Sequence, residues 1–152
     1  MPRIELTTLI AAPIEIVFDL ARNIDAHAAS HASHDEKAVA GRTAGLIEEG
    51  EDVTWEAVHF GVRQCLTSRI VAMRRPIYFR DSMVRGAFKR LDHDHIFEVA
   101  PNGTLMKDVF DFASPLGVLG KFADWLVVAR YLRRLLEKRN QVLKQLAESP
   151  NT

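Results

Sequence analysis

The chain has 152 residues, and its 20 lysines and arginines balance 20 aspartates and glutamates, so its formal net charge at pH 7 is zero with histidine neutral. A balanced charge gives no general attraction to nucleic acid or to an anionic membrane, and neither is expected as a partner. A chain of this length is typical of one domain, so a single ligand-binding domain over residues 1–152 is expected.

Cysteine content and hydropathy exclude further classes of protein. Cys65 is the only cysteine in the sequence, which excludes an internal disulfide and favours a reducing compartment. No apolar run approaches the roughly 20 residues of a membrane-spanning helix. The first residues lack the charged and apolar regions of a signal peptide. A cytoplasmic protein is therefore expected.

The N-terminal third predicts one strand followed by two helices. Apolar and polar residues alternate over positions 2–10, as in a strand. Pro13 suits the first position of a helix and Glu15 complements the positive end of its dipole. A second short helix is expected over about residues 24–33. The loop at residues 42–51 is interpreted either as a lid over a pocket or as an ordinary loop that packs Leu46 and Ile47 on the first helices.

The rest of the chain predicts strands and one long helix. Strands are expected at residues 36–41, 52–58, 61–73, 77–84, 87–99 and 104–112, with turns between most of them at glycine or proline. A turn at residues 114–120 leads into an amphipathic helix. Its apolar stripe consists of Leu119, Phe122, Leu126, Ala129, Leu132, Leu136, Leu143 and Leu146. Its basic residues are interpreted as a solvated face, or else as a surface for an acidic partner or anionic lipid: Arg130, Arg133, Arg134, Lys138, Arg139 and Lys144.

This order of elements, with four local stretches, resembles the START-like helix-grip (SRPBCC) superfamily, which includes the birch-pollen allergens, and within it the polyketide cyclase/dehydrase-like branch. The stretches are residues 12–18 (APIEIVF), 50–55 (GEDVTW), 79–88 (FRDSMVRGAF) and 115–120 (PLGVLG). The resemblance implies an α+β fold in which a curved antiparallel sheet of about seven strands wraps a long C-terminal helix and encloses a pocket. The resemblance supports the fold but does not indicate a reaction, because members of the superfamily include lipid carriers, hormone receptors, aromatase/cyclases and hydrolase-like proteins.

Strand alternation places ionisable groups on apolar strand faces that are expected to point inward. The candidates for catalysis are His95, Asp108, His93, His59 and Asp81. A carboxylate beside a histidine would fix its tautomer and raise its pKa toward neutrality. These groups can pair with one another structurally, bind a ligand or transfer protons. A two-residue turn at Pro101 and Asn102 places His95 opposite Asp108, whereas a three-residue turn separates them.

The favoured function is a carrier or sensor that binds a small hydrophobic or amphipathic molecule between sheet and helix, without a cofactor and as a monomer or homodimer. Two alternatives stay open: an enzyme of the polyketide cyclase, dehydratase or hydrolase kind that uses a His/Asp pair for general acid/base chemistry, and an interaction module that uses the basic helix. The expected ligand-binding residues are Trp55, His59, Phe79, Asp81, Met83, His93, His95, Phe97, Met106, Asp108, Phe110, Phe112, Phe122 and Leu126.

Three histidines, His27, His31 and His34, recur at helical spacing, and such spacing is known among zinc ligands. No second group of ligands is evident in the sequence, so no metal site is predicted. A solvated helix face is expected, with a pocket rim as the alternative. Trp125 and Tyr131 depart from the apolar stripe, and are interpreted as a pocket cap or a contact with a second subunit.

Overall fold

The computed structural model describes residues 3–113 and 127–149. The expected turn at residues 114–120 and the helical positions Leu119, Phe122, Trp125 and Leu126 lie outside this range. The described elements are β1 (Arg3–Ile10), α1 (Ile14–Ala21), α2 (Ile24–Ser30), the 3₁₀ turn η1 (Ala32–His34), β2 (Lys37–Gly41), β3 (Asp52–His59), β4 (Val62–Arg74), β5 (Tyr78–Arg85), β6 (Arg90–Ala100), β7 (Gly103–Ala113) and α4 (Ala129–Glu148). This order confirms the predicted α+β arrangement.

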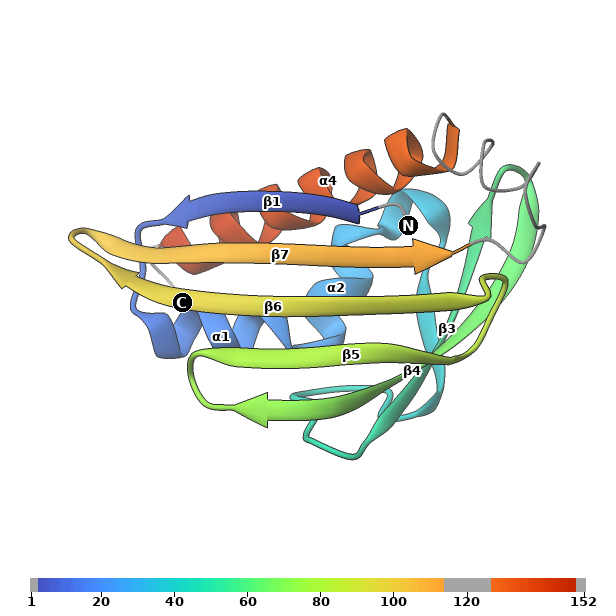
Figure 1. Cartoon of the computed structure of the whole chain (residues 1–152), viewed down its shortest axis with the longest axis horizontal. Helices are drawn as coiled ribbons and strands as arrows, with labels where there is room; N and C mark the ends of the chain where they lie inside the picture. The colour runs from blue at the N-terminus through green and yellow to red at the C-terminus, as the bar shows by residue number, and fades with distance from the viewer. Residues whose placement is uncertain (1–2, 114–126, 150–152) are drawn as a thin grey trace.

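The seven strands form one antiparallel sheet in the order β1-β7-β6-β5-β4-β3-β2. Figure 1 shows α1, α2 and α4 together on one side of this sheet, while β3 and β4 rise steeply at one end. Register shifts interrupt the β4–β5 pairing between Thr67 and Ser68 and between Ile70 and Ala72. Such bulges bend a strand and increase its twist, so β4 is where the sheet curves around the helices.

The β6–β7 hairpin settles which of the two sequence-derived registers is present. Ala100 pairs with Gly103, which leaves a two-residue turn and places His95 opposite Asp108. Gly103 is required by close packing, because a Cβ at this position would lie 2.1 Å from the carbonyl oxygen of Ile10. The register of the hairpin therefore fixes the positions of His93, His95 and Asp108 relative to one another along the two strands.

Two apolar clusters fill the space between sheet and helices. In the first, the ring of Phe18 on α1 meets Phe79 and Phe97 edge-to-face at centroid distances of 5.6 and 5.3 Å. In the second, Leu136 of α4 packs against Phe110 and Phe112 on β7. Phe97, Met106 and Phe112 are buried in these clusters, and Met83 packs against the second one.

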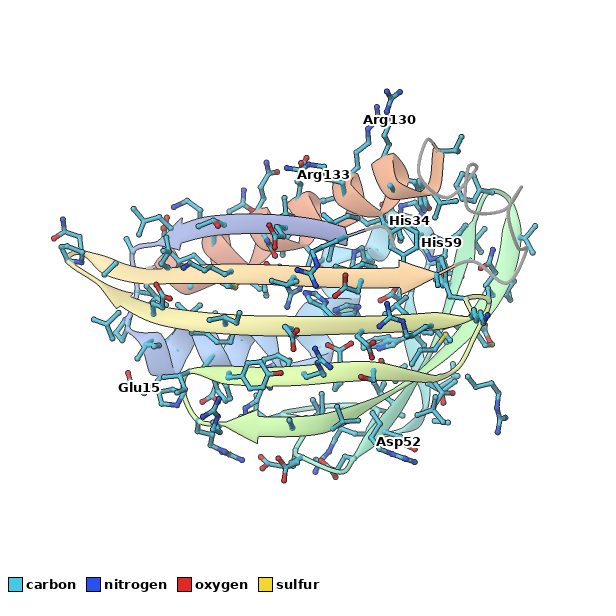
Figure 2. All side chains as sticks on the ribbon, viewed as in Figure 1. Glu15, His34, Asp52, His59, Arg130 and Arg133 are labelled. Carbon is cyan, nitrogen blue, oxygen red and sulfur yellow. The ribbon has the colours of Figure 1, made fainter. Side chains whose placement is uncertain are left out.

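The prediction that the basic residues of the C-terminal helix form a solvated face is wrong for Arg139. Arg130 and Arg133 project outward from α4 (Figure 2), but Arg139 is only 2% exposed. Its position, three residues after Leu136 and four before Leu143, places it on the apolar stripe. The apolar stripe in the sequence has no apolar residue on this turn, between Leu136 and Leu143. That gap could have indicated that Arg139 points inward.

The guanidinium of Arg139 links α4 to the sheet. Its Nη1 donates to Asp108 Oδ1 and to Asn140 Oδ1, each at 3.0 Å. Asn140 in turn donates to the second oxygen of Asp108 at 2.8 Å. Asp108 is 1% exposed, so this is a buried and fully hydrogen-bonded ion pair. Such a pair tolerates loss of one partner badly, because the other charge is left buried without compensation.

We predict that Arg139→Ala lowers the free energy of unfolding by about 3–5 kcal/mol. Arg133→Ala, on the exposed face of α4, should change it by less than about 0.5 kcal/mol. Because the loss at position 139 comes from the uncompensated carboxylate, adding Asp108→Asn should recover part of it. Urea unfolding of the three variants measures these changes. Equal losses in Arg139→Ala and Arg133→Ala would show that the ion pair does not hold the helix.

Candidate functional site

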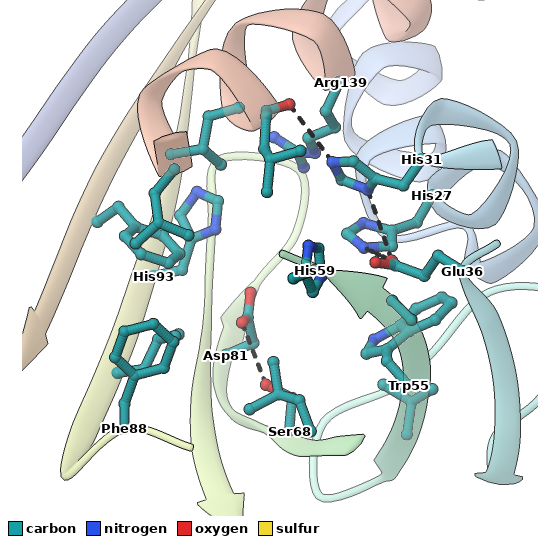
Figure 3. A pocket seen from close by; sticks show the side chains of 18 of the residues that line it. His27, His31, Glu36, Trp55, His59, Ser68, Asp81, Phe88, His93 and Arg139 are labelled. Carbon is teal, nitrogen blue, oxygen red and sulfur yellow. Dashed lines mark hydrogen bonds and ion pairs between the residues drawn. The ribbon is translucent and has the colours of Figure 1, made fainter. Parts of the chain in front are cut away.

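A cavity of about 250 Å³ lies between the inner face of the sheet, the segment around α2, and α4. Its apolar lining includes Ile24, Trp55, Ala57, Phe79, Leu91, Phe110, Leu132, Leu135 and Leu136. Its polar lining includes His27, His31, Glu36, His59, Asp81, His93, His95, Tyr131 and Arg139. In Figure 3, His93 and Asp81 lie across from His27, His31 and Glu36, with His59 between them.

The structure brings some of the expected ligand-binding residues to this cavity and not others. Seven line it: Trp55, His59, Phe79, Asp81, His93, His95 and Phe110. Asp108 is buried behind the histidines, whereas Met83, Phe97, Met106 and Phe112 belong to the packed clusters. Phe122 and Leu126 lie outside the described residues. The polar candidates therefore cluster more completely than the apolar ones.

The hydrogen bonds of His95 define its protonation state. Its Nε2 lies 2.6 Å from Asp81 Oδ2, and since a carboxylate only accepts, Nε2 carries the proton. Its Nδ1 lies 3.2 Å from Arg139 Nη2, which only donates, so Nδ1 keeps its lone pair. His95 is therefore neutral, and both of its nitrogens are already engaged by the protein.

His93 is arranged differently. Its Nε2 donates to Asp108 Oδ1 at 2.8 Å, which again places the proton on Nε2. Its ring stacks on that of His95 with centroids 3.7 Å apart. Among the described residues, no hydrogen bond reaches Nδ1 of His93. This nitrogen is therefore the one in the pair that has an available lone pair.

The expected coupling of His95 with Asp108 is only partly correct. The two residues face each other across the hairpin, but His95 Nδ1 lies 3.6 Å from Asp108 Oδ1 and makes no hydrogen bond to it. The short contacts instead run from His93 to Asp108 and from His95 to Asp81. Strand pairing fixes which residues are neighbours, but side-chain direction decides which of them bond.

Burial lowers the pKa of His95, whereas a neighbouring carboxylate was expected from the sequence to raise it. Removal from water, then the nearby His93, lowers the pKa of His95 to about 4, against the opposing effect of Asp81. Burial alone would raise the pKa of Asp81, but its hydrogen bond from His95 lowers it to about 2. Burial likewise opposes ionisation of Asp108, yet the charge of Arg139 and the bond from His93 hold its pKa well below its usual value. His95 is thus a neutral ring between the negative charge of Asp81 and the positive charge of Arg139.

His27, His31 and Glu36 form a second polar group. The prediction that the histidines lie on a solvated helix face is wrong for His27 and His31. His31 is 6% exposed, and His27 and His31 line the cavity with Glu36. His27 Nε2 and His31 Nδ1 lie 2.7 and 3.5 Å from Glu36 Oε1. Burial, opposed by Glu36, lowers the pKa of His27, which favours its neutral form. The pocket-rim alternative was the correct one.

Glu36, like Arg139, lines the cavity but was not among the site residues predicted from the sequence. It lies between η1 and β2, directly after Asp35, whose backbone is left-handed at φ 53°. That turn reverses the chain and directs Glu36 back toward α2 (Figure 3). A helical His-x-x-x-His pair followed five residues later by a glutamate was the available signal, but nothing in the sequence specifies the turn.

The remaining predicted features surround the cavity. Tyr131 of α4 lines it, with its hydroxyl 2.7 Å from His59 Nδ1 and 3.4 Å from His34 Nδ1; His34 and His59 lie side by side in Figure 2. In the loop at residues 42–51, Ile47 is buried and accepts a hydrogen bond from Arg22 at 3.0 Å. This loop packs on the first helices, as the second of its two interpretations expected.

Solved structures share this architecture at low sequence identity. The protein TTHA0849 from Thermus thermophilus superposes with a TM-score of 0.74 at 19% identity, covering 97% of this chain and 100% of that one. A START superfamily protein from Mycobacterium smegmatis gives 0.72 at 15% identity, covering 96% and 97%. The chain has a START-like helix-grip fold. Major latex-like protein 151 from Panax ginseng also superposes at 0.72 and 15% identity, covering 97% and 98%.

These identities establish the helix-grip fold and not a shared activity. No family model matches the chain, and no curated protein matches it in sequence. Among the described residues, no helix is long and apolar enough to cross a membrane. The function must therefore be argued from the cavity itself.

We predict that the protein loses stability in mild acid partly through His95. Between about pH 6.5 and pH 4 the unfolded chain protonates this residue and the folded protein does not, so the free energy of unfolding falls as pH falls. One such group contributes up to about 1.4 kcal/mol per pH unit. Below about pH 4 the decline continues, because Asp81 stabilises the fold only while ionised.

His95→Gln keeps an N–H group for Asp81 but does not titrate. Urea unfolding at several pH values should therefore give a shallower pH dependence for this variant than for the wild type between pH 6.5 and 4. Equal slopes would contradict the assignment of a neutral His95.

Proposed function

We propose that the protein binds one small, mainly hydrophobic molecule in the cavity, as a carrier or sensor. The observation that supports this most directly is the composition of the cavity wall: apolar side chains on most sides, with a few hydrogen-bonding groups fixed by the protein. This is the composition of a small-molecule site. The resemblance of the sequence to a superfamily that includes lipid carriers is consistent with it.

The size of the cavity limits the ligand. At about 250 Å³ it lies just below the roughly 300–1,000 Å³ of pockets that hold drug-sized ligands. A compact molecule of one or two rings, or a short branched chain, fits this volume better than a long acyl lipid. Burial of its apolar surface, at roughly 25 cal/mol per Å², would supply most of the gross binding energy.

The polar groups limit its chemistry. His95 and Asp81 already satisfy each other, and Ser68 donates to the other Asp81 oxygen at 3.3 Å. The open Nδ1 of His93 accepts but does not donate. The best-matched ligand therefore carries a hydroxyl or N–H group that donates to His93, while its apolar part contacts Phe110 and Leu136.

A second candidate function follows from the His93–Asp108 bond. A carboxylate that holds the Nε2 proton of a histidine orients the opposite nitrogen as a general base. His93 would then remove a proton from the bound molecule, as in the cyclase, dehydratase or hydrolase alternative. His95 is unsuited to this role because both of its nitrogens are engaged.

We predict that the fluorescent two-ring probe 2-naphthol, which carries a hydroxyl donor, binds in the cavity and is displaced by filling it. Ala57 lines the cavity, so Ala57→Leu should weaken probe binding at least about tenfold, since the added atoms have no other space. Val99→Leu, at a site 77% exposed, is the matched control and should bind as the wild type does. Equal affinity in both variants would place the probe on the surface and contradict the proposal.

His93 separates the two candidates. Native mass spectrometry of wild-type and His93→Gln protein, each purified from the native host, reads the mass of any retained molecule. A carrier retains a molecule of the same mass in both, in a smaller amount in the variant because the acceptor nitrogen of His93 is lost. An enzyme that depends on His93 accumulates unreacted substrate in the variant, so the retained masses differ.

A further inference from the structure

The group formed by His27, His31 and Glu36 has no part in the proposed binding of an organic molecule. We propose that these three residues form a site for a divalent transition-metal ion of the zinc and iron class, with its remaining coordination positions open to the cavity. The proposal does not rest on the proposed function, because it concerns the ion alone.

The positions of the donor atoms support this site. One ring nitrogen from each histidine and one oxygen of Glu36 lie within 4.8 Å of one another. Two of the separations, from His27 Nε2 and His31 Nδ1 to Glu36 Oε1, are 2.7 and 3.5 Å. Metal bonds of about 2.0–2.2 Å in tetrahedral geometry place ligand atoms about 3.3 Å apart. Small side-chain adjustments therefore bring the three atoms onto one ion.

The tautomer of His31 leaves an unfavourable contact that a cation would relieve. Its Nε2 lies 3.4 Å from the carbonyl oxygen of Leu135, and a carbonyl only accepts, so Nε2 carries the proton. In the neutral ring, Nδ1 then presents its lone pair toward Glu36 Oε1 and toward Ser30 Oγ at 3.4 Å, whose hydrogen is donated to the carbonyl oxygen of His27. Glu36 Oε1 is buried, and its short contacts are with the ring nitrogens of His27 and His31, but among the described residues no hydrogen bond of good geometry reaches it. A metal ion between His31 Nδ1 and Glu36 Oε1 satisfies both of them.

The contact with Leu135 has a second consequence. Histidines that bind metals commonly donate their other N–H group to a carbonyl or carboxylate, which fixes the ring for coordination. Leu135 lies on α4, so the long helix provides this support for His31. Figure 3 shows His31 and His27 one above the other, both directed toward the carboxylate of Glu36.

A similar group, Asp81 with His93 and His95, is less suited to a cation. Its donor atoms also lie within 4.8 Å of one another. However, Arg139 donates to His95 Nδ1 at 3.2 Å, so an ion there would sit beside a fixed positive charge. The charge of Arg139 also acts on His27, but the hydrogen bonds of Arg139 go to Asp108, Asn140, His95 and the carbonyl of Ala21. None of them goes to His27, His31 or Glu36.

The donor set indicates the kind of ion and its role. Two imidazoles and one carboxylate suit zinc, iron or nickel, whereas magnesium and calcium prefer oxygen ligands. Three protein ligands with an open position are typical of catalytic rather than structural sites. A water molecule, or a carbonyl or carboxylate of a bound molecule, would complete the coordination from the cavity side.

The test is calorimetric titration of the chelator-treated full chain with zinc chloride. We expect one zinc ion per chain in the wild type. Glu36→Gln should weaken zinc binding more than about 100-fold, because loss of an outer-shell partner alone costs about 10–100-fold. His34→Gln is the matched control: this histidine belongs to the same segment, but its Nδ1 faces the carbonyl of Val58 and the hydroxyl of Tyr131.

Three results would overturn the proposal: no stoichiometric zinc binding by the wild type, equal weakening in His34→Gln and Glu36→Gln, or loss of binding in His93→Gln alone. Circular dichroism without metal verifies that each variant folds. If Glu36→Gln does not fold, His27→Gln replaces it, since the His27 side chain is 30% exposed and tolerates change better. Probe binding measured on the same samples reports the proposed organic-ligand site separately.

Discussion

The buried ion pair between Arg139 and Asp108 is the interaction on which the rest of the site depends. It joins α4 to β7 at a point from which water is excluded. Removing two charges from water is costly, and the cost is offset only because hydrogen bonds engage the guanidinium and both carboxylate oxygens. One of those bonds goes to Nδ1 of His95, and Asp108 in turn accepts from His93. One ion pair therefore fixes the helix and the tautomers of both histidines.

This arrangement divides the cavity wall into parts with different chemistry. Five of the six histidines line the cavity, but they are not equivalent. His95 is held neutral and fully bonded, whereas His93 keeps one open acceptor. His27 and His31 meet a buried carboxylate that is not among the hydrogen-bond partners of Arg139. A single apolar space thus has one wall suited to orient an organic molecule and another suited to an ion.

Much of the fold could be predicted from the sequence, because alternation and turn residues are local signals. The order of strands and helices along the chain, the two short helices and the inward position of His93 and His95 follow from such patterns. The site required information that local patterns lack. Arg139 is the intermediate case, since the gap in the apolar stripe between Leu136 and Leu143 marks an inward position. Glu36 depends on the left-handed turn at Asp35, and the diagonal bonds of His93 and His95 depend on side-chain direction.

The central claim is that the charged groups around the Arg139–Asp108 pair hold a proton on Nε2 of both histidines and keep His95 neutral. Proton–nitrogen correlation NMR of the imidazole side chains measures this directly. At pH 7 the account predicts a proton on Nε2 of both His93 and His95, with His95 staying neutral until the pH approaches 4. An unprotonated Nε2 on either ring, or a His95 that titrates near pH 6.5, would contradict it.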